Sequence, residues 1–244
     1  MFSPSFSPPP LDLALTSDEI HVWCAPLDLS VSRFEMLSQT LSLDERMRAE
    51  RFHFEKDRKR FIIGRGILRI ILGYYLGVEP SRLQFCYGKC GKPALANTFG
   101  NGILHFNLSR SEGLALYAFS RDYQVGADIE YIRHIPEVDQ IVERFFSATE
   151  NNVFRALPES KKKEAFFNCW TRKEAFIKAI GDGLFYPLDK FDVSLVPGEP
   201  AELLGIDGDS KGPSQWTIQQ LKPAFGFAAA FAVQGRSLRL HCWQ

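Results

Sequence analysis

The sequence lacks the features that mark several large classes of protein. Its 29 basic and 29 acidic side chains leave no net charge, so nothing global favours a nucleic-acid or membrane partner. It has no run of about 18 apolar residues, and its first residues have neither a basic start nor an apolar signal core. We therefore expect a cytoplasmic protein that binds neither nucleic acid nor membrane.

Cysteine and histidine are too few and too scattered for a disulfide framework or a zinc site. The five cysteines form an odd set, and the nearest pair, Cys86 and Cys90, has no second Cys or His pair beside it. The five histidines show no metal-ligand spacing, and neither a Gly-x-Ser-x-Gly motif nor a P-loop is present. These absences predict reduced cysteines and argue against a zinc centre or a catalytic histidine.

What is present predicts a folded α+β protein, because 45% of the residues are hydrophobic and can fill a sizeable core. Helical spacing of apolar residues predicts helices over 57–77, 137–145, 148–156 and 161–180. Ser42 and Glu45 have the capping-box spacing that opens an earlier helix. Alternating or apolar runs predict strands over 20–24, 83–87, 103–109, 114–120, 124–131, 191–196, 216–221, 225–233 and 238–243.

The order of these elements predicts two similar lobes. Residues 12–122 and 123–244 would each pack a long helix on a mainly antiparallel sheet, with the active site in the cleft between them. The Ser/Pro-rich residues 1–11 predict a loose or extended arm.

Three carboxylates and a lysine suggest a divalent-metal and phosphate site. Asp128 and Glu130 are two residues apart on a predicted strand, so both side chains project from one face. Glu174 lies on a predicted helix with Lys178 one turn along the same face. A half-exposed strand and a solvated helix face with an ion pair would explain the same residues. The like charges of the strand pair and the apolar neighbours of the helix pair favour the metal site.

Basic residues gather elsewhere in the chain. They occur repeatedly between residues 46 and 60, and again at Lys89, Lys92 and Arg110. Arginine forks and lysine ammonium groups both suit phosphate, so this set could hold several phosphates.

Taken together, these residues resemble the surfactin-type 4′-phosphopantetheinyl transferases, from about residue 20 to the C-terminal end. The motifs that carry the resemblance are Gly126-Ala-Asp128-Ile-Glu130, Trp170-x-x-Lys173-Glu174-Ala-x-x-Lys178, Tyr87-Gly with Gly91-Lys92-Pro93, His105-Phe-Asn107-Leu-Ser109-Arg-Ser111, and Arg144-Phe-Phe-Ser147-x-Thr149-Glu150. The resemblance implies a monomer that holds coenzyme A between two lobes. It would transfer the phosphopantetheine arm to a serine of an apo acyl or peptidyl carrier protein and release 3′,5′-ADP.

The resemblance also implies residue roles. Asp128, Glu130 and Glu174 would hold Mg²⁺, with Mn²⁺ also acceptable, and Glu174 would deprotonate the carrier serine. The catalytic set would be Glu174, Lys178 and Asp128. The coenzyme A site would comprise Arg48, Lys92, Arg110, Ser109, Ser111, Lys173 and Lys178.

Two positions depart from the family pattern. Arg110 stands where many relatives have histidine, which keeps a cation and makes it permanent. Glu45 stands near a basic position of the family's 3′-phosphate site, so Arg46 or Arg48 would have to compensate.

Two other functions use the same residues. A Mg²⁺-dependent hydrolase of nucleotide pyrophosphates would use the same acidic cluster with water as nucleophile. A non-catalytic carrier-protein binding module would need no catalytic base. Docking of an acidic carrier is expected on residues 131–156, near Arg133 and Arg144.

Overall fold

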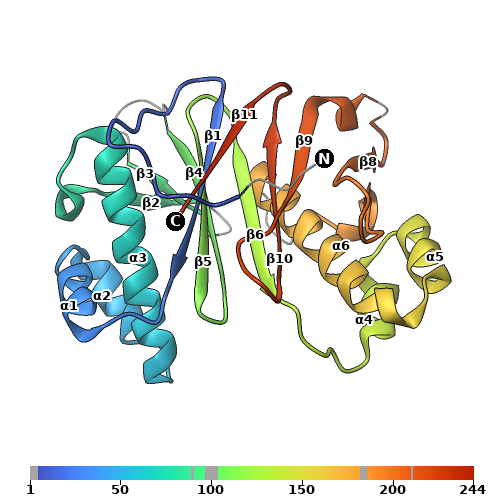
Figure 1. Cartoon of the computed structure of the whole chain (residues 1–244), viewed down its shortest axis with the longest axis horizontal. Coiled ribbons are helices and arrows are strands. Elements are labelled where there is room, and N and C mark those ends of the chain that lie inside the picture. The colour runs from blue at the N-terminus through green and yellow to red at the C-terminus, as the bar shows by residue number, and fades with distance from the viewer. Residues whose placement is uncertain (1–4, 89–90, 97–103, 182–185, 210) are drawn as a thin grey trace.

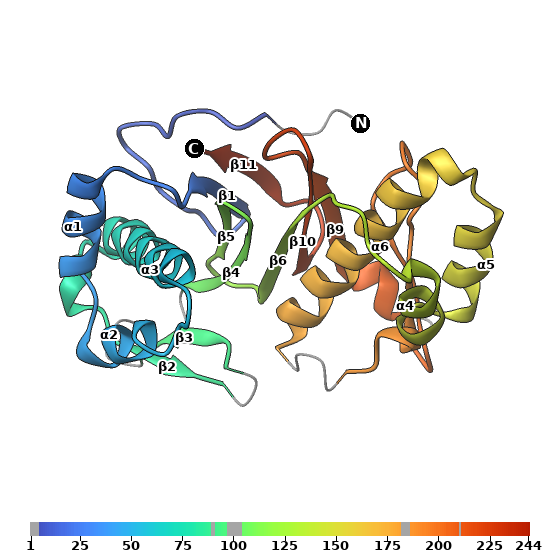
Figure 2. The ribbon, with the colours of Figure 1, turned by 90° about the horizontal axis from the view of Figure 1, so that it is seen from below.

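Two sheets stand side by side in the middle of the molecule, and a long helix covers the outer face of each (Figures 1 and 2). This computed structural model describes residues 5–88, 91–96, 104–181, 186–209 and 211–244. Lys89, Cys90 and the first residue of the strand predicted over 103–109 lie outside the described residues. The mixture of helices and mainly antiparallel sheets confirms the α+β prediction.

The helices agree closely with the predicted ones. They are α1 Val31–Gln39, α2 Leu43–Ala49, α3 Glu55–Leu76, α4 Val138–Phe145, α5 Ala148–Ala156 and α6 Glu159–Ile180, with 3₁₀ turns η1 Pro80–Arg82, η4 Leu188–Lys190 and η5 Gly212–Gln215. Both long helices end at a glycine in the left-handed region, Gly77 with φ 63° and Gly181 with φ 91°. The sequence analysis did not predict α1.

The strands form two main sheets and two small hairpins. They are β1 Glu19–Pro26, β2 Phe85–Tyr87, β3 Pro93–Leu95, β4 His105–Ser111, β5 Leu114–Ser120, β6 Val125–Tyr131, β7 Phe191–Val193, β8 Leu203–Ile206, β9 Trp216–Leu221, β10 Phe227–Gln234 and β11 Arg239–Trp243. The first sheet has the order β11-β1-β5-β4 and the second β6-β10-β9. Only the β1–β11 pair is parallel among the pairs in these two sheets.

The layers follow from alternation along the strands. On β5, Tyr117 and Phe119 belong to the core beneath α3, whereas Leu116 and Ala118 belong to the core between the two sheets. Both faces of this strand are apolar because both are covered. A third core, which includes Phe176, lies between α6 and the second sheet.

The two ends of the chain depart from the simple two-lobe division. β11 comes from the second predicted lobe, yet it pairs with β1 in the first sheet. The arm also lies against this strand: Ser7 accepts a hydrogen bond from the backbone N–H of Gln244 at 3.0 Å and donates its own to Cys242 at 3.1 Å. Within the arm, Ser7 is therefore held against the end of β11 by two backbone hydrogen bonds.

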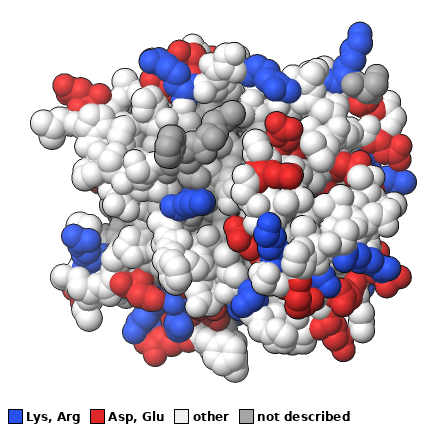
Figure 3. Space-filling model, turned by 45° about the vertical axis from the view of Figure 1, so that its right-hand side comes forward, with Lys and Arg blue, Asp and Glu red and all other residues white. Residues whose placement is uncertain are grey.

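Charges of both signs are mixed on the surface. The face in Figure 3 shows lysine and arginine interspersed with aspartate and glutamate. Within the described residues, no helix is both long and apolar enough to cross a bilayer.

Candidate active site

A cavity of about 480 Å³ opens where the two lobes meet. Residues of both lobes line it: Arg48, Phe61, Gly64, Arg65, Gly91, Lys92, Pro93, Asn107, Leu108, Arg110, Glu174, Ile177, Lys178 and Gly181. Five predicted site residues, Arg48, Lys92, Arg110, Glu174 and Lys178, are therefore brought together around one space.

Close packing of α6 on β6 positions the acidic part of the site. A Cβ added at Gly126 would lie 2.0 Å from the backbone oxygen of Ala175 and 2.3 Å from the backbone nitrogen of Ala179. Only glycine lets the helix approach the strand this closely. The approach brings Glu174 and Lys178 of α6 next to Asp128 of β6.

Asp128 and Lys178 form the centre of a buried polar network. The Lys178 Nζ lies 2.5 Å from Asp128 Oδ1 and 3.7 Å from Glu174 Oε2. The Ser109 hydroxyl, on β4, donates to the same Asp128 oxygen at 2.7 Å and accepts from Lys178 at 3.3 Å. Burial opposes the charge of Lys178, but Asp128 and Glu174 outweigh it and raise the pKa of the ammonium. Lys178 is thus held in its charged form.

Glu130 and Glu174 carry carboxyl groups with raised pKa values. Burial is the larger cause in both cases, and the neighbouring carboxylates add to it. Ser111 donates a hydrogen bond to Glu130 Oε2 at 2.9 Å and so holds that side chain in place. Ser109 and Ser111 thus orient carboxylates from behind the cavity instead of lining it.

These carboxylates suit a hard divalent cation. Asp128 Oδ2 is buried and has no hydrogen-bond partner, an arrangement that is costly unless a cation or water meets it. Lys178 forms ion pairs with Asp128 and Glu174, and the charge of Glu130 also acts on it, so the ammonium balances part of the charge of the three carboxylates. Carboxylate oxygens are the donors that Mg²⁺ and Mn²⁺ prefer, but the ligand atoms of Asp128, Glu130 and Glu174 do not converge on one point in this structure, and of the three only Glu174 lines the cavity.

The N-terminal lobe supplies a cationic side to the cavity, made of Arg48, Arg65 and Arg110. Aromatic rings hold these guanidinium groups: Arg48 lies 5.7 Å and Arg110 5.5 Å from the centroid of Phe61. A ring orients a cation without neutralising its charge. Burial lowers the pKa of Arg65 and of Arg110. These cations suit an anionic ligand that enters the cavity.

Lys92 joins the two lobes. Its ammonium donates to the backbone oxygen of Lys178 at 2.6 Å and to that of Val125 at 3.2 Å. Burial lowers the pKa of this lysine to about 8. Lys92 therefore lines the cavity with an ammonium group that loses its proton just above neutral pH.

Lys173, which the resemblance places in the coenzyme A site, does not face the cavity. Its side chain is fully buried and forms an ion pair with Glu150 at 2.8 Å. It also donates to the backbone oxygens of Leu188 and Phe191, both at 2.6 Å. Successive residues of a helix project about 100° apart, so Glu174 reaches the cavity while Lys173 points into the interior, and the predicted coenzyme A contact is not seen for Lys173.

Glu45 also has a structural place. It is buried and lies 2.6 Å from Arg69 Nε and 3.3 Å from Arg65 Nε. The acidic residue at this position therefore pairs with two arginines of α3, one of which, Arg65, also lines the cavity beside Arg48.

Sequence reasoning missed several residues that line the cavity, among them Phe61, Gly64 and Arg65. The sequence feature that could have indicated this part of the cavity is Gly64-Arg-Gly66. Two glycines inside a helical pattern predict that another segment packs closely against the helix there. A Cβ at Gly64 would lie 3.3 Å from Arg110 Cδ, and one at Gly66 would lie 2.8 Å from Leu37 Cβ.

Comparisons with known proteins cover both lobes. Residues 124–233 match the 4′-phosphopantetheinyl transferase superfamily, and residues 28–121 match the 4′-phosphopantetheinyl transferase N-terminal family. The 4′-phosphopantetheinyl transferase HetI of Nostoc sp. is 42% identical over 243 residues, which cover 100% of this chain and 99% of the relative. The 4′-phosphopantetheinyl transferase psf-1 of Bacillus pumilus is 34% identical over 83% of this chain and 84% of its own. The 4′-phosphopantetheinyl transferase Sfp of Bacillus subtilis is 31% identical over 68% of this chain and 72% of its own.

Proposed function

Since the chain belongs to the 4′-phosphopantetheinyl transferase family, whose members transfer phosphopantetheine from coenzyme A to carrier proteins, we propose that the cavity between its lobes is where it performs this transfer. The observation that supports this most directly is the charge of the two sides. Arg48, Arg65 and Arg110 face Glu174 and Lys178 across one space. A pyrophosphate bound there would meet arginines on one side and the carboxylate cluster on the other.

In this proposal Asp128, Glu130 and Glu174 hold Mg²⁺, which would neutralise charge on the pyrophosphate when bound. Arg48 and Arg110 bind the phosphates of coenzyme A, and Lys92 adds a third cation. Lys178 stabilises the charge that develops as the bond to the departing nucleotide breaks.

Glu174 is the proposed base. Burial raises the pKa of its carboxyl group, which makes the carboxylate a better proton acceptor than an exposed glutamate. The carrier serine would lose its proton to Glu174 as its oxygen bonds to the phosphorus of the pantetheine arm. The bond to 3′,5′-ADP would break in the same displacement.

Transfer can be tested by intact mass. The protein would be incubated with coenzyme A, Mg²⁺ and several apo carrier proteins, and each carrier should gain one phosphopantetheine arm. Glu174→Gln should abolish the gain, whereas Glu164→Gln, an exposed carboxylate on the same helix, should leave it intact.

The alternatives give different results in the same assay. Consumption of coenzyme A with no gain of carrier mass would favour the pyrophosphate hydrolase. Binding of coenzyme A or carrier with no reaction by the wild-type protein would favour the non-catalytic module.

We place carrier docking on residues 131–156, beside the cavity. Arg133 and Arg144 are both exposed there and could meet an acidic carrier. The Arg133→Glu and Arg144→Glu variants should raise the KM for the carrier and leave that for coenzyme A unchanged. An unchanged carrier KM would place docking elsewhere.

A further inference from the structure

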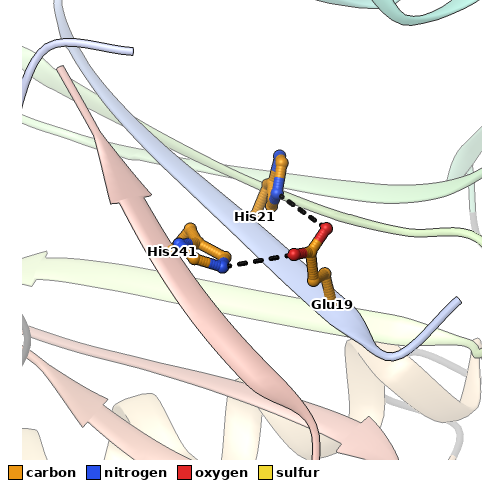
Figure 4. A group of neighbouring side chains, drawn as sticks. All are labelled: Glu19, His21 and His241. Carbon is orange, nitrogen blue, oxygen red and sulfur yellow. Dashed lines mark ion pairs between the residues drawn. The ribbon is translucent and has the colours of Figure 1, made fainter. Parts of the chain in front are cut away.

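A second cluster of metal-ligating side chains lies on the first sheet, at the strand pair farthest from β4. Glu19 and His21 are two residues apart on β1, so they share a face, and His241 of β11 is the register partner of His21. Figure 4 shows the three side chains turned toward one another. Their ligand atoms all lie within 4.8 Å of each other, and among the described residues they are the group of three that converges in this way.

We propose that Glu19, His21 and His241 bind a divalent transition metal of the Zn²⁺ class. Glu19 Oε2 lies 3.7 Å from His21 Nε2, and Glu19 Oε1 lies 3.4 Å from His241 Nε2. Two ligand atoms that each lie about 2.0–2.2 Å from a tetrahedral ion are roughly 3.3–3.5 Å apart. Small movements of the three side chains would therefore bring their ligand atoms to tetrahedral positions around one ion. Imidazole nitrogen prefers zinc, copper or nickel to Mg²⁺, which separates this site from the carboxylate cluster.

The two histidines offer free electron pairs. His241 Nε2 is buried and has no hydrogen-bond partner, a cost that a bound metal would remove. His21 is 2% exposed, and its Nε2 lies 3.7 Å from Glu19 Oε2, so this nitrogen is directed into the cluster.

A second layer of contacts holds His21 in place. Its Nδ1 lies 2.7 Å from the Tyr75 hydroxyl, which also accepts a hydrogen bond from the Trp23 indole at 2.9 Å. In the metal-binding tautomer, Nδ1–H would donate to this hydroxyl and direct Nε2 at the ion. The backbone N–H of Thr16 donates to Glu19 Oε2 at 3.0 Å and orients the carboxylate.

Arg239 is the cation that now occupies part of this site. Its guanidinium lies 3.2 Å from Glu19 Oε1, but it also pairs with Asp18, and 60% of its side chain is exposed. Arg239 could therefore turn toward Asp18 and leave Glu19 to a metal. It follows that removing Arg239 should strengthen metal binding.

A metal here would connect distant parts of the chain. His21 and His241 are roughly 220 positions apart, so the ion would fasten β11 to β1 and close most of the chain into a loop. β5 separates the β1–β11 pair from β4, where the serines of the active site lie. The expected role is therefore stabilisation of the sheet, and activity with Mg²⁺ alone should not require the ion.

The test is a Zn²⁺ titration of the full chain without a histidine tag, after chelator treatment and with excess Mg²⁺ to occupy the carboxylate cluster. We expect one tightly bound ion per chain by calorimetry, and Co²⁺ should give the visible absorption of a four-coordinate ion. At a hundredfold excess over Kd, Tm should rise by roughly 5–10 °C. The His241→Gln variant should weaken binding at least about tenfold, and Arg239→Gln should tighten it.

His134→Gln, which removes an exposed histidine outside the cluster, is the matched control and should bind as the wild type does. His241 is 38% exposed and is the safer ligand to replace, because the loss of buried His21 could unfold the sheet. The proposal would be wrong if the wild type bound no Zn²⁺, or if His241→Gln bound it as tightly. Equal loss in His134→Gln would also overturn it.

Discussion

The two lobes contain the same buried ion-pair arrangement built from different residues. In the N-terminal lobe, Glu45 follows Ser42 by three positions, accepts the Ser42 backbone N–H at 3.1 Å and pairs with Arg69 of α3 at 2.6 Å. Arg69 also donates to the backbone oxygens of Pro80 and Leu83, beside the turn η1. The arginine thus ties a short helix, a long helix and a 3₁₀ turn together.

The C-terminal lobe repeats each of these contacts. Glu150 follows Ser147 by three positions, accepts its backbone N–H at 2.8 Å and pairs with Lys173 of α6 at 2.8 Å. Lys173 in turn donates to two backbone oxygens beside the turn η4. The framework is duplicated even though the sequence shows no obvious repeat.

The lobes differ where their long helices meet the cavity. The side from α3 carries Arg65, whereas the side from α6 carries Glu174 and Lys178. The comparison shows that the buried framework and the residues that line the cavity can differ independently. The same arrangement of helices presents an arginine from one lobe and a glutamate with a lysine from the other.

The largest effect is expected from breaking the buried pairs. Lys173→Met should lower the free energy of unfolding by about 3–5 kcal/mol, because it leaves Glu150 buried without its partner. Arg69→Met should cost less, because Arg65 stays 3.3 Å from Glu45. Urea unfolding would measure both. A double variant, Lys173→Met with Glu150→Gln, should recover part of the loss. If Lys173→Met left the stability unchanged and weakened coenzyme A binding, Lys173 would instead be a ligand-binding residue.

This pair shows why part of the site could not be predicted from the sequence. The partner of Lys173 lies 23 positions away on another helix, and local spacing says nothing about such a contact. The family resemblance therefore implies a coenzyme A contact for Lys173, and only the tertiary structure shows its pairing with Glu150. Asp128, Glu174 and Lys178 were easier, because spacing along one strand or helix already places such side chains on a common face.

The same distinction holds for the fold. Local patterns predicted β5, β9 and α5 with the bounds that the structure shows. The place of β11 beside β1 and the meeting of His21 with His241 depend on pairing across almost the whole sequence. Neither has a local signal.

The second effect tests the cationic side. Arg110→Gln should raise the KM for coenzyme A about 10–100-fold, the value of one or more charge-assisted hydrogen bonds to phosphate. Steady-state kinetics with a saturating carrier would measure it, and Arg121→Gln, outside the cavity, is a suitable control. A loss confined to kcat would contradict a role in binding.

The third effect is a pH dependence. Burial lowers the pKa of Lys92 to about 8, so its ammonium is charged below that pH and neutral above it. Coenzyme A affinity should therefore fall by up to about tenfold between pH 7 and pH 9. Calorimetric binding at several pH values would show it. The Lys92→Met variant should bind more weakly at pH 7 and lack this decline; a decline of the same size would assign it to another group.

The smallest effect distinguishes the two capping serines. The Ser147 hydroxyl accepts the Glu150 backbone N–H at 3.1 Å and also donates to Asp192, so Ser147→Ala should cost about 1–2 kcal/mol. The Ser42 hydroxyl donates to exposed Asp44, so Ser42→Ala should cost less than about 0.5 kcal/mol. Thermal unfolding of both variants would measure the difference, and equal losses would show that the two caps are equivalent.

The parallel pairing of β11 with β1 sets an order of events during synthesis. β1 can pair with β5 once residues 114–120 have been made, but its other edge stays open until residues 239–243 follow. An open edge exposes unpaired backbone groups to any neighbouring strand. The nascent chain therefore exposes an aggregation-prone strand edge throughout the synthesis of the roughly 200 residues between β1 and β11, and only the pairing of β11 removes it.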